Sequence, residues 1–361
     1  MKKVLTIVAL AFGILNANAQ YQIGNSDFES WGSDANEPGS GWYSFSSATG
    51  SFSSFSSSSK STCTKVTGTD ACGGSGTSVL LESKKVVIAN ANGNLTTGII
   101  NMGSTTPSNS ANYNYTDRNG SNHWSMTGHP DSLVYWGKFT RGGSGTYTGR
   151  CHAILHGDID YKDPYETSAN EASYKIAEAA VYCTETDTWT RYSGPFNYTG
   201  VTSGTMYLLA SFTTNETPGG SKGDKFYIDN VQLIYNSELA SATYNNDAVN
   251  FTNDTATVDA LYDESKLVLT SNGHGASIEK SYDASTAVLT ITVKGEDISE
   301  NASNYHTYTI QFKMPPVPLL VDILIGKTTD YILEVADVNG DTKVSLADLT
   351  KLINLVKQVE E

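Results

Sequence analysis

Short apolar runs separated by turn residues make up most of the chain from residue 20 to residue 236. The runs are rich in β-branched and aromatic side chains, and the turns between them contain Gly, Asn, Pro and Asp. The clearest runs read SVLLES, KKVVIAN, SLVYWGKF, CHAILHG, TMYLLASF and KFYIDNVQLIY. Many strands at this spacing predict a β-sandwich, most simply a jelly roll. A helical pattern of useful length occurs here only around residues 170–180, and the serine-rich run at 44–62 predicts an exposed loop.

A second β-rich unit follows at residues 241–313. Its runs KLVLTS, ASIEKSYD, AVLTITVKG and YHTYTIQFK alternate polar and apolar residues, which is typical of half-buried strands. We expect a small β-sandwich or a sheet that serves as a spacer. The segment MPPVP at 314–318 separates this unit from the tail, because proline interrupts both strands and helices.

The last twenty-five residues, DVNGDTKVSLADLTKLINLVKQVEE, predict one calcium-binding loop followed by one amphipathic helix. Oxygen ligands recur along the loop, with a backbone carbonyl at position seven: Asp337, Asn339, Asp341, Lys343, Ser345 and Asp348. Ca²⁺ takes about six to eight oxygen ligands, and a curled loop with this spacing directs them to one point. The alternative is a solvated acidic turn before a helix. We therefore predict a Ca²⁺ site in this loop.

This loop and helix resemble one repeat of a dockerin, the short module through which polysaccharide-degrading proteins bind cohesin-bearing partners. Like a dockerin loop, it ends in Asp at position twelve and runs directly into a helix. An upstream segment at 319–327 aligns with the terminal helix at an offset of 32 residues, but the residues before that segment, HTYTIQFKMPPV, lack acidic ligands. Thr342 stands where glycine normally makes the sharp turn. Residues 314–361 are thus expected to form a degenerate dockerin-like module with one calcium loop and a cohesin-like partner.

The first nineteen residues predict a secretory signal peptide. Lys2 and Lys3 precede an apolar run at 4–15, and the motif Ala17-Asn18-Ala19 predicts cleavage after Ala19. The run is too short to span a membrane, and no later segment reaches about 18 consecutive apolar residues. We expect a secreted protein, extracellular, periplasmic or associated with the cell surface.

The chain is acidic, with 38 Asp and Glu against 23 Lys and Arg and a formal charge of −15. Such a surface argues against nucleic acids and anionic membranes as partners, because both repel negative charge. Neutral glycans need no counter-charge, so they remain compatible with this composition.

Four cysteines occur in the chain: Cys63, Cys72, Cys151 and Cys183. An even number in an exported protein predicts disulfides, with three possible connectivities. Cys63 and Cys72 share one loop and are expected to pair locally. Cys151 and Cys183 both lie in strand-like runs and could pair across neighbouring strands.

Several motifs of the first domain resemble the PCMD family, a proposed carbohydrate metabolism domain of exported proteins from glycan-degrading bacteria. They are DFESWG at 27–32, GWYSF at 41–45, DSLVYWGKF at 131–139, WTRYSGPFNY at 189–198 and GDKFYIDNVQLIYN at 223–236. The resemblance spans most of the domain. It implies a jelly roll linked to carbohydrates and no established chemistry.

Candidate catalytic residues are few. The acidic cluster in HGDIDYKDPYE is the best source of paired carboxylates for glycoside hydrolysis: Asp158, Asp160, Asp163 and Glu166. The alternative is a solvated loop between strands. His152 and His156 lie on one face of a strand, with Ile154 between them, and could form an outward metal pair; the alternative is that they are ordinary strand residues.

Candidate ligand-binding residues are aromatic, because sugars stack their C–H faces on flat rings. Tyr113, Tyr115 and Trp124 lie in a loop rich in Asn, Ser and Gly, where they could form a platform or pack against the sandwich. Trp31 and Trp42 are candidates for the core.

Three functions are therefore open. We favour a secreted, non-catalytic glycan-binding protein with a calcium-binding tail, because no acid/base pair stands out. The alternatives are a glycoside hydrolase with its carboxylates in the jelly roll, and a structural adhesin or spacer. The fold by itself does not decide among them.

Overall fold

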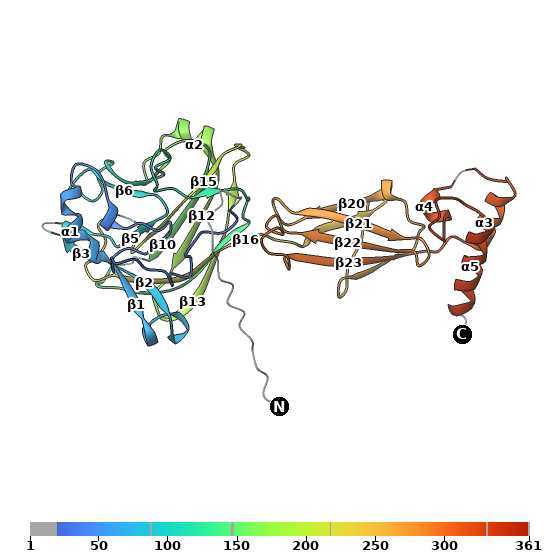
Figure 1. The fold of residues 1–361 in the computed structure, drawn as a ribbon, viewed down its shortest axis with the longest axis horizontal. Helices are drawn as coiled ribbons and strands as arrows, with labels where there is room; N and C mark the ends of the chain where they lie inside the picture. Colours follow the sequence, from blue (N-terminus) through green and yellow to red (C-terminus); the bar gives the residue numbers. More distant parts are fainter. Residues whose placement is uncertain (1–19, 87–88, 146–147, 217, 330, 360–361) are drawn as a thin grey trace, which may run out of the picture.

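A computed structural model describes residues 20–86, 89–145, 148–216, 218–329 and 331–359. The predicted signal peptide lies outside these residues. Three hydrophobic clusters follow one another: the first runs from Ile23 to Tyr235, the second from Tyr244 to Val335 and the third from Leu320 to Leu352. Figure 1 shows the three corresponding parts in a row, with the helical tail at the C-terminal end.

The first part is a sandwich of two antiparallel sheets. One sheet has the order β1 (Cys63–Thr67), β2 (Thr77–Glu82), β16 (Lys225–Ile234), β9 (Ser132–Thr140) and β13 (Thr186–Pro195). The other has the order β14 (Asn197–Tyr198), β12 (Lys175–Cys183), β10 (Gly149–His156), β15 (Met206–Thr213) and β5 (Asn94–Thr96), with β8 (Ser125–Met126) beside β15. The predicted mainly β class, with a sandwich as first domain, is confirmed.

Alternation along each strand places the core between the two sheets. In β9, Leu133, Tyr135 and Phe139 are buried, while Trp136 and Lys138 point to the other face. Trp42 is fully buried, and Trp31 packs against the same cluster, as expected for core residues.

One predicted helix was wrong in its extent. The helix α2 is Ser168–Tyr174, and β12 begins directly after it at Lys175. Ala177, Ala179 and Val181 alternate with more exposed residues, which is the period of a strand. Alanine-rich sequence permits both structures, and burial against the opposite sheet selects the strand.

A third, smaller sheet covers the outer face of the six-stranded sheet. It has the order β11 (Lys162–Asp163), β7 (Asn112–Tyr115) and β6 (Ile99–Met102). A small apolar cluster fills part of the space between the two sheets, where Tyr161 packs with Ile154 of β10 and Leu209 of β15. The remaining space is the cavity described below.

The second part is a small β-sandwich, as predicted. One sheet has the order β18 (Asp247–Ala248), β17 (Leu239–Tyr244) and β20 (Leu267–Ser271). The other has the order β19 (Thr255–Val258), β23 (Tyr305–Phe312), β22 (Val288–Lys294) and β21 (Ser277–Asp283), with β19 parallel to β23.

The tail contains α3 (Val317–Leu324), α4 (Leu333–Ala336) and α5 (Leu346–Val359). Leu320 of α3 and Leu352 of α5 are both fully buried in the third cluster, so the two segments aligned in the sequence pack together. Where the first loop of a tandem module would lie, the chain forms β23 instead. No helix among the described residues is long and apolar enough to cross a membrane.

The disulfide prediction is corrected, because all four cysteines are free thiols. Cys151 and Cys183 do lie on adjacent strands, but Cys151 pairs with Val181 and Cys183 pairs with Gly149. Such diagonal neighbours are about 7–8 Å apart, beyond the usual disulfide span of about 4.4–6.8 Å between Cα atoms.

Cys63 and Cys72 lie at opposite ends of one hairpin. Cys63 pairs with Leu81 at its base, whereas Cys72 lies in the connection at the tip, between Thr67 and Thr77. The backbone N–H of Cys72 donates to the hydroxyl of Ser78, which pairs with Val66, so Cys72 lies about three residues of strand, roughly 10 Å, from the level of Cys63. Closeness in sequence therefore did not bring them together.

Candidate functional site

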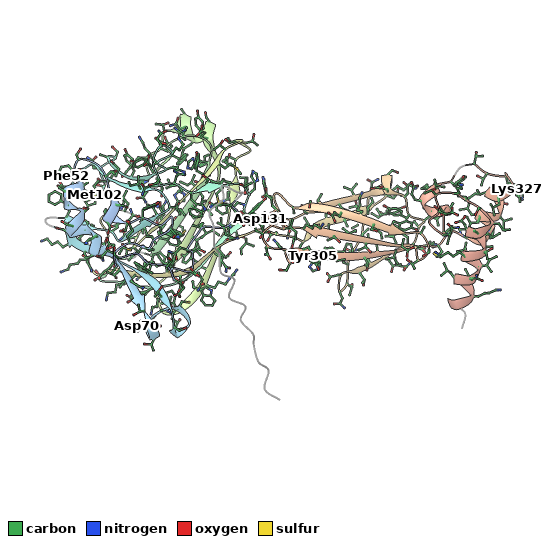
Figure 2. The ribbon with its side chains drawn as sticks, in the orientation of Figure 1. Phe52, Asp70, Met102, Asp131, Tyr305 and Lys327 are labelled. Atoms are coloured by element: carbon green, nitrogen blue, oxygen red, sulfur yellow. The ribbon has the colours of Figure 1, made fainter. Side chains whose placement is uncertain are left out.

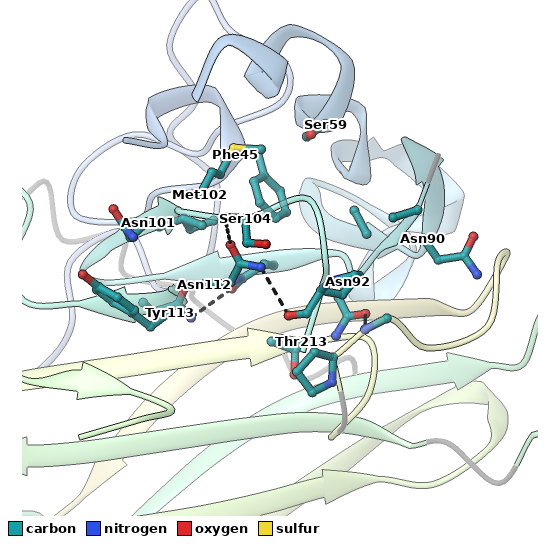
Figure 3. Close-up of a pocket in the computed structure, with 18 of the residues that line it drawn as sticks. Phe45, Ser59, Asn90, Asn92, Asn101, Met102, Ser104, Asn112, Tyr113 and Thr213 are labelled. Atoms are coloured by element: carbon teal, nitrogen blue, oxygen red, sulfur yellow. Dashed lines mark hydrogen bonds between the residues drawn. The ribbon is translucent and has the colours of Figure 1, made fainter. Parts of the chain in front are cut away.

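A cavity of about 350 Å³ lies at one end of the first domain, between the six-stranded sheet and the segments that cover it (Figure 3). Its walls combine three classes of residue. Phe45, Phe52 and Phe55 form an aromatic side; Arg150, Asp163 and Glu216 supply charge; and amides contribute from Asn90, Asn92, Asn94, Asn101, Asn112, Asn114 and Asn215. Phe52 and Met102 mark this end of the molecule, far from the second domain (Figure 2).

The aromatic side comes from the serine-rich run that the sequence predicts as a loop. This run forms short helical turns, η1 (Phe45–Ser47), η2 (Ser53–Phe55) and α1 (Ser56–Ser59). The rings of Phe52 and Phe55 stack with centroids 6.2 Å apart and planes at 15°. Three phenylalanines in a run otherwise made mostly of small polar residues were the available signal for this wall, which was not predicted from the sequence.

An amide network holds the floor of the cavity in place. Asn94 of β5 and Asn114 of β7 exchange two hydrogen bonds, of 2.9 and 3.2 Å. Asn112 accepts from the backbone N–H groups of Gly103 and Ser104 and donates to the carbonyl of Thr106. These bonds tie the covering sheet to the main sheet, so the cavity is preformed.

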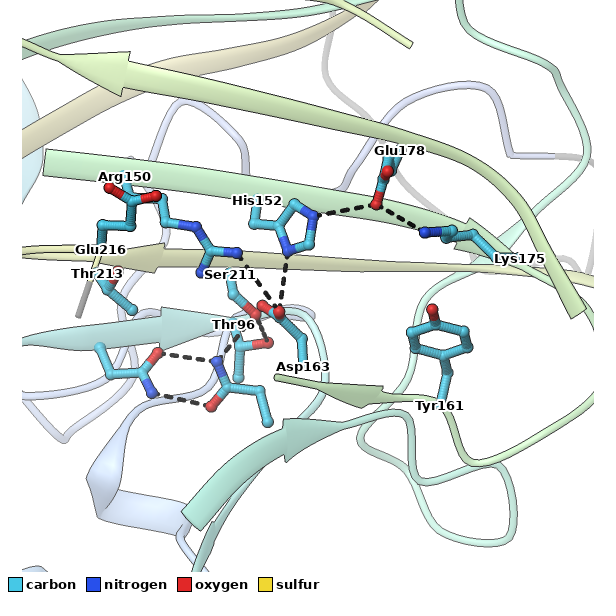
Figure 4. Close-up of polar contacts among 12 residues, drawn as sticks. Thr96, Arg150, His152, Tyr161, Asp163, Lys175, Glu178, Ser211, Thr213 and Glu216 are labelled. Atoms are coloured by element: carbon cyan, nitrogen blue, oxygen red, sulfur yellow. Dashed lines mark hydrogen bonds and ion pairs between the residues drawn. The ribbon is translucent and has the colours of Figure 1, made fainter. Parts of the chain in front are cut away.

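The charged groups form a chain across β10 and its neighbours (Figure 4). Asp163 Oδ1 lies 2.9 Å from His152 Nδ1 and 3.6 Å from Arg150, and the other ring nitrogen of His152 lies 3.6 Å from Glu178. Burial alone would raise the pKa of Asp163, but the hydrogen bond from His152 and the charges of His152 and Arg150 outweigh burial and lower it. Arg150, at 3.6 Å, is too far from Asp163 for a hydrogen bond.

The four predicted catalytic carboxylates do not form a pair. Asp158 and Asp160 both bind Arg118, at 2.6 and 2.9 Å, in a surface loop. Glu166 accepts from the backbone of Lys162 and Thr167. Asp163 is the member of this cluster that lines the cavity.

The two histidines of β10 have protein partners instead of a metal geometry. His152 contacts Asp163, as described above, and His156 is buried between the rings of Tyr161 and Tyr207. Burial lowers the pKa of His156 to about 4. Its ring nitrogens bond to Thr116 at 2.7 Å and to the carbonyl of Gly157 at 2.8 Å.

The predicted aromatic platform is divided. Tyr113 lines the cavity, and Tyr115 contacts it edge to face with centroids 5.8 Å apart. Trp124 instead packs against the main core and fills the space above Gly24 and Gly41. It therefore has a structural role in this fold.

The C-terminal loop brings three of the six predicted metal ligands together. Carboxylate oxygens of Asp337, Asp341 and Asp348 all lie within 4.8 Å of one another. Asp337 and Asp348 are buried, at 7% and 0% exposure, and carboxylates in proteins are rarely buried unless they are paired. Thr342 adopts φ of +69°, the left-handed turn that position six requires.

Comparisons with known proteins gave structural likenesses alone. No family model and no curated protein matches the chain. A candidate glycoside hydrolase from Bacteroides thetaiotaomicron is 22% identical, with a TM-score of 0.37. The match covers 48% of this chain and 57% of the hydrolase, so this chain spans just over half the length of that protein. A family 61 carbohydrate-binding module in complex with β-1,4-galactotriose has 9% identity and a TM-score of 0.25, over 48% and 83%. The family 11 module of a cellulosomal cellulase from Clostridium thermocellum has 11% identity and a TM-score of 0.22, over 48% and 81%.

Proposed function

We propose that this chain is a secreted, non-catalytic protein that binds a neutral glycan in the cavity of its first domain. The observation that carries the proposal is the combination of an aromatic wall with amide and guanidinium groups in one cavity of about 350 Å³. Sugar rings offer C–H faces to aromatic side chains and hydroxyls to polar ones, so both halves of the cavity have a use.

The charges of the cavity favour a neutral ligand. Arg150 is opposed by two carboxylates, Asp163 and Glu216, so an anionic sugar placed beside Arg150 would be repelled by its neighbours. Hydroxyl groups avoid this cost, because they accept from Arg150 and from the amides and donate to the carboxylates.

The test is a glycan array with the full chain, followed by calorimetry on each hit. We expect Phe52→Ala to weaken glycan binding about tenfold, because the sugar ring loses the phenyl ring on which it would stack. Tyr305→Ala is the matched control, since this ring is 51% exposed on the second domain, away from the cavity (Figure 2). Equal loss in both variants, or no binding to any neutral glycan, would refute the proposal and leave the spacer role.

A second candidate function is glycoside hydrolysis, because two carboxylates line the cavity. Hydrolysis needs a general acid that is protonated near neutral pH, and the lowered pKa of Asp163 makes it unsuited to that role. Glu216 would then have to be the acid. Release of reducing sugar that Glu216→Gln abolishes would establish the enzyme; binding without release supports the module.

We also propose that the C-terminal loop holds one Ca²⁺. The residues that fit the ion supply oxygens only, as Ca²⁺ requires: Asp337, Asn339, Asp341, Ser345 and Asp348 by side chain, and Lys343 by its carbonyl. The ion would neutralise three clustered carboxylates and so stabilise the loop. Partnership of the tail with a cohesin-like protein, and export through the N-terminal signal, belong to the same proposal.

Calorimetry with Ca²⁺ tests the loop directly. We expect about one site per chain, lost in Asp337→Ala and kept in Asp322→Ala, because Asp322 lies on α3, where its carboxylate is 3.4 Å from the ammonium of Lys327. A chain that gives no heat at millimolar Ca²⁺, or one that loses binding in both variants, contradicts the assignment.

A further inference from the structure

Two of the five tryptophans have no place in the core of the first domain. Trp31, Trp42 and Trp124 lie in or against the main cluster. Trp136 and Trp189 instead lie on the solvent-facing side of the five-stranded sheet, on the neighbouring strands β9 and β13. This is the sheet opposite the one that carries the cavity.

A tyrosine and two cations complete this face. Lys138 of β9 lies over two rings, 5.3 Å from the centroid of Trp189 and 4.4 Å from that of Tyr227 on β16. The two rings meet edge to face, with centroids 6.2 Å apart and planes at 77°. Arg191 of β13 stands directly opposite Trp136 in the strand register, and Trp136 is 37% exposed.

This face carries two cations that are free to meet a ligand. Neither Lys138 nor Arg191 has an ion-pair partner among the described residues, although the whole chain has a formal charge of −15. Of the nearby carboxylates, Glu82 is paired with Lys84 at 3.1 Å, and Asp229 is buried and bonded to the hydroxyl of Ser78 at 2.6 Å. Asp70 lies beyond Tyr227, on the side away from Arg191. Asp229 stands opposite Trp136 on β16, and Asp187 of β13 is exposed two residues before Trp189. Because Asp229 is buried, Arg191 and Lys138 are the accessible charges next to Trp136.

We propose that this aromatic–cationic face, defined by Trp136, Lys138, Trp189, Arg191 and Tyr227, is a second glycan-binding site, and that its ligand is an acidic polysaccharide carrying uronate or sulfate groups. Exposed Trp136 offers a surface for a sugar ring. Arg191 lies opposite Trp136 on β13 and Lys138 lies two residues farther along β9, so both can meet its anionic groups, and a guanidinium can bind a carboxylate or sulfate through two parallel hydrogen bonds. Contact with the two rings fixes the position of the Lys138 ammonium before the ligand arrives.

The experiment is affinity electrophoresis of the full chain in gels containing polygalacturonate, chondroitin sulfate or a neutral galactan, with single-stranded DNA as a further polyanion. We expect retardation by an acidic polysaccharide that weakens as salt rises, because the contact is between exposed charges. Trp136→Ala and Arg191→Gln should each weaken it about tenfold. Arg191 is exposed, so its substitution leaves the core intact.

Lys65→Gln is the matched control, since it removes a lysine that also lies over an indole ring, 5.7 Å from that of Trp31, at a different place in the same sheet. Phe52→Ala, which affects the cavity, should leave this binding unchanged, so failure of the neutral-glycan proposal and failure of this one are separable. The proposal is overturned if no acidic polysaccharide retards the chain, if galactan or DNA is held as well at this face, or if the two variants bind like the native chain. In the last case Lys138 serves only to hold the sheet together.

Discussion

At the scale of single residues, Thr342 is the position where sequence and conformation conflict most clearly. Its backbone has φ of +69°, and its N–H donates to Asp337 Oδ2 at 2.6 Å. Asp337 Oδ1 also accepts from the N–H groups of Gly340 and Asp341. A β-branched residue is strained at such a φ, so the carboxylate of Asp337 and its contacts impose the turn on it.

We expect Thr342→Gly to stabilise the loop by about 1 kcal/mol, because glycine adopts this φ without strain. If this free energy of about 1 kcal/mol favours the calcium-bound loop, the affinity for Ca²⁺ should rise about fivefold. Gly340→Ala provides the opposite case, since Gly340 has φ of +79° and an added Cβ would meet no atom within 4 Å, so only backbone strain changes. Calcium titration of both variants checks the pair; weaker affinity in Thr342→Gly would contradict the argument.

At the scale of elements, α3 and α5 are two related segments that share one small core. Leu320 and Leu352, which correspond in the sequence alignment, are both at 0% exposure, with Ala336 and Val338 between them. The outward side of α5 carries Leu346, which is 68% exposed. The helices are short, so tertiary packing supplies most of their stability.

Leu352→Ala should therefore destabilise the tail by about 2–5 kcal/mol through lost burial and the cavity left behind. Hydrogen exchange is the suitable measurement, because a chain with several cores does not unfold in two states. We expect faster exchange in α3 as well as α5, since each helix covers the other. Leu346→Ala should change neither helix, and protection of α3 that survives Leu352→Ala would show that the helices are independent.

At the scale of the whole molecule, the first two domains meet at a polar joint near Asp131 (Figure 2). Asp131 accepts from the backbone N–H of Asn236 at 2.7 Å and of His274 at 2.8 Å. His129 lies 2.9 Å from Glu296 of the second domain. The rings of Tyr198 and His274 stack with centroids 3.7 Å apart and planes at 7°. Specific contacts thus fix the angle between the domains.

This joint should depend on pH. The hydrogen bond to Glu296 raises the pKa of His129. The stabilisation of the joint by protonated His129 is therefore complete below the ordinary histidine pKa of 6.5, and it is lost as pH rises through the raised pKa. His129 in turn lowers the pKa of Glu296, although burial alone would raise it. The stabilisation of the joint by ionised Glu296 is therefore complete above the ordinary pKa of 4.5, and it is lost as pH falls through the lowered pKa. The joint is therefore tightest between these two values.

Small-angle scattering across this range should show the narrowest spread of domain orientations near pH 5.5 and a wider spread near pH 8. His129→Gln should remove the dependence on the alkaline side. His306→Gln should retain it, since His306 pairs with Asp254 within the second domain. An identical pH profile in His129→Gln and the native chain would exclude this mechanism.

The sequence by itself determined most of the strands, the order of the three parts and the acidic loop before the last helix. These depend on local patterns: alternation along β9, ligand spacing from Asp337 to Asp348 and helical period in α5. Tertiary structure decided everything that joins distant segments. Phe52, Asn114 and Arg150 become one cavity only because a third sheet folds over the sandwich, and Cys151 fails to reach Cys183 because the strand register offsets them. Periodicity fixes which face a side chain occupies, whereas register and the packing of layers determine which residues meet there.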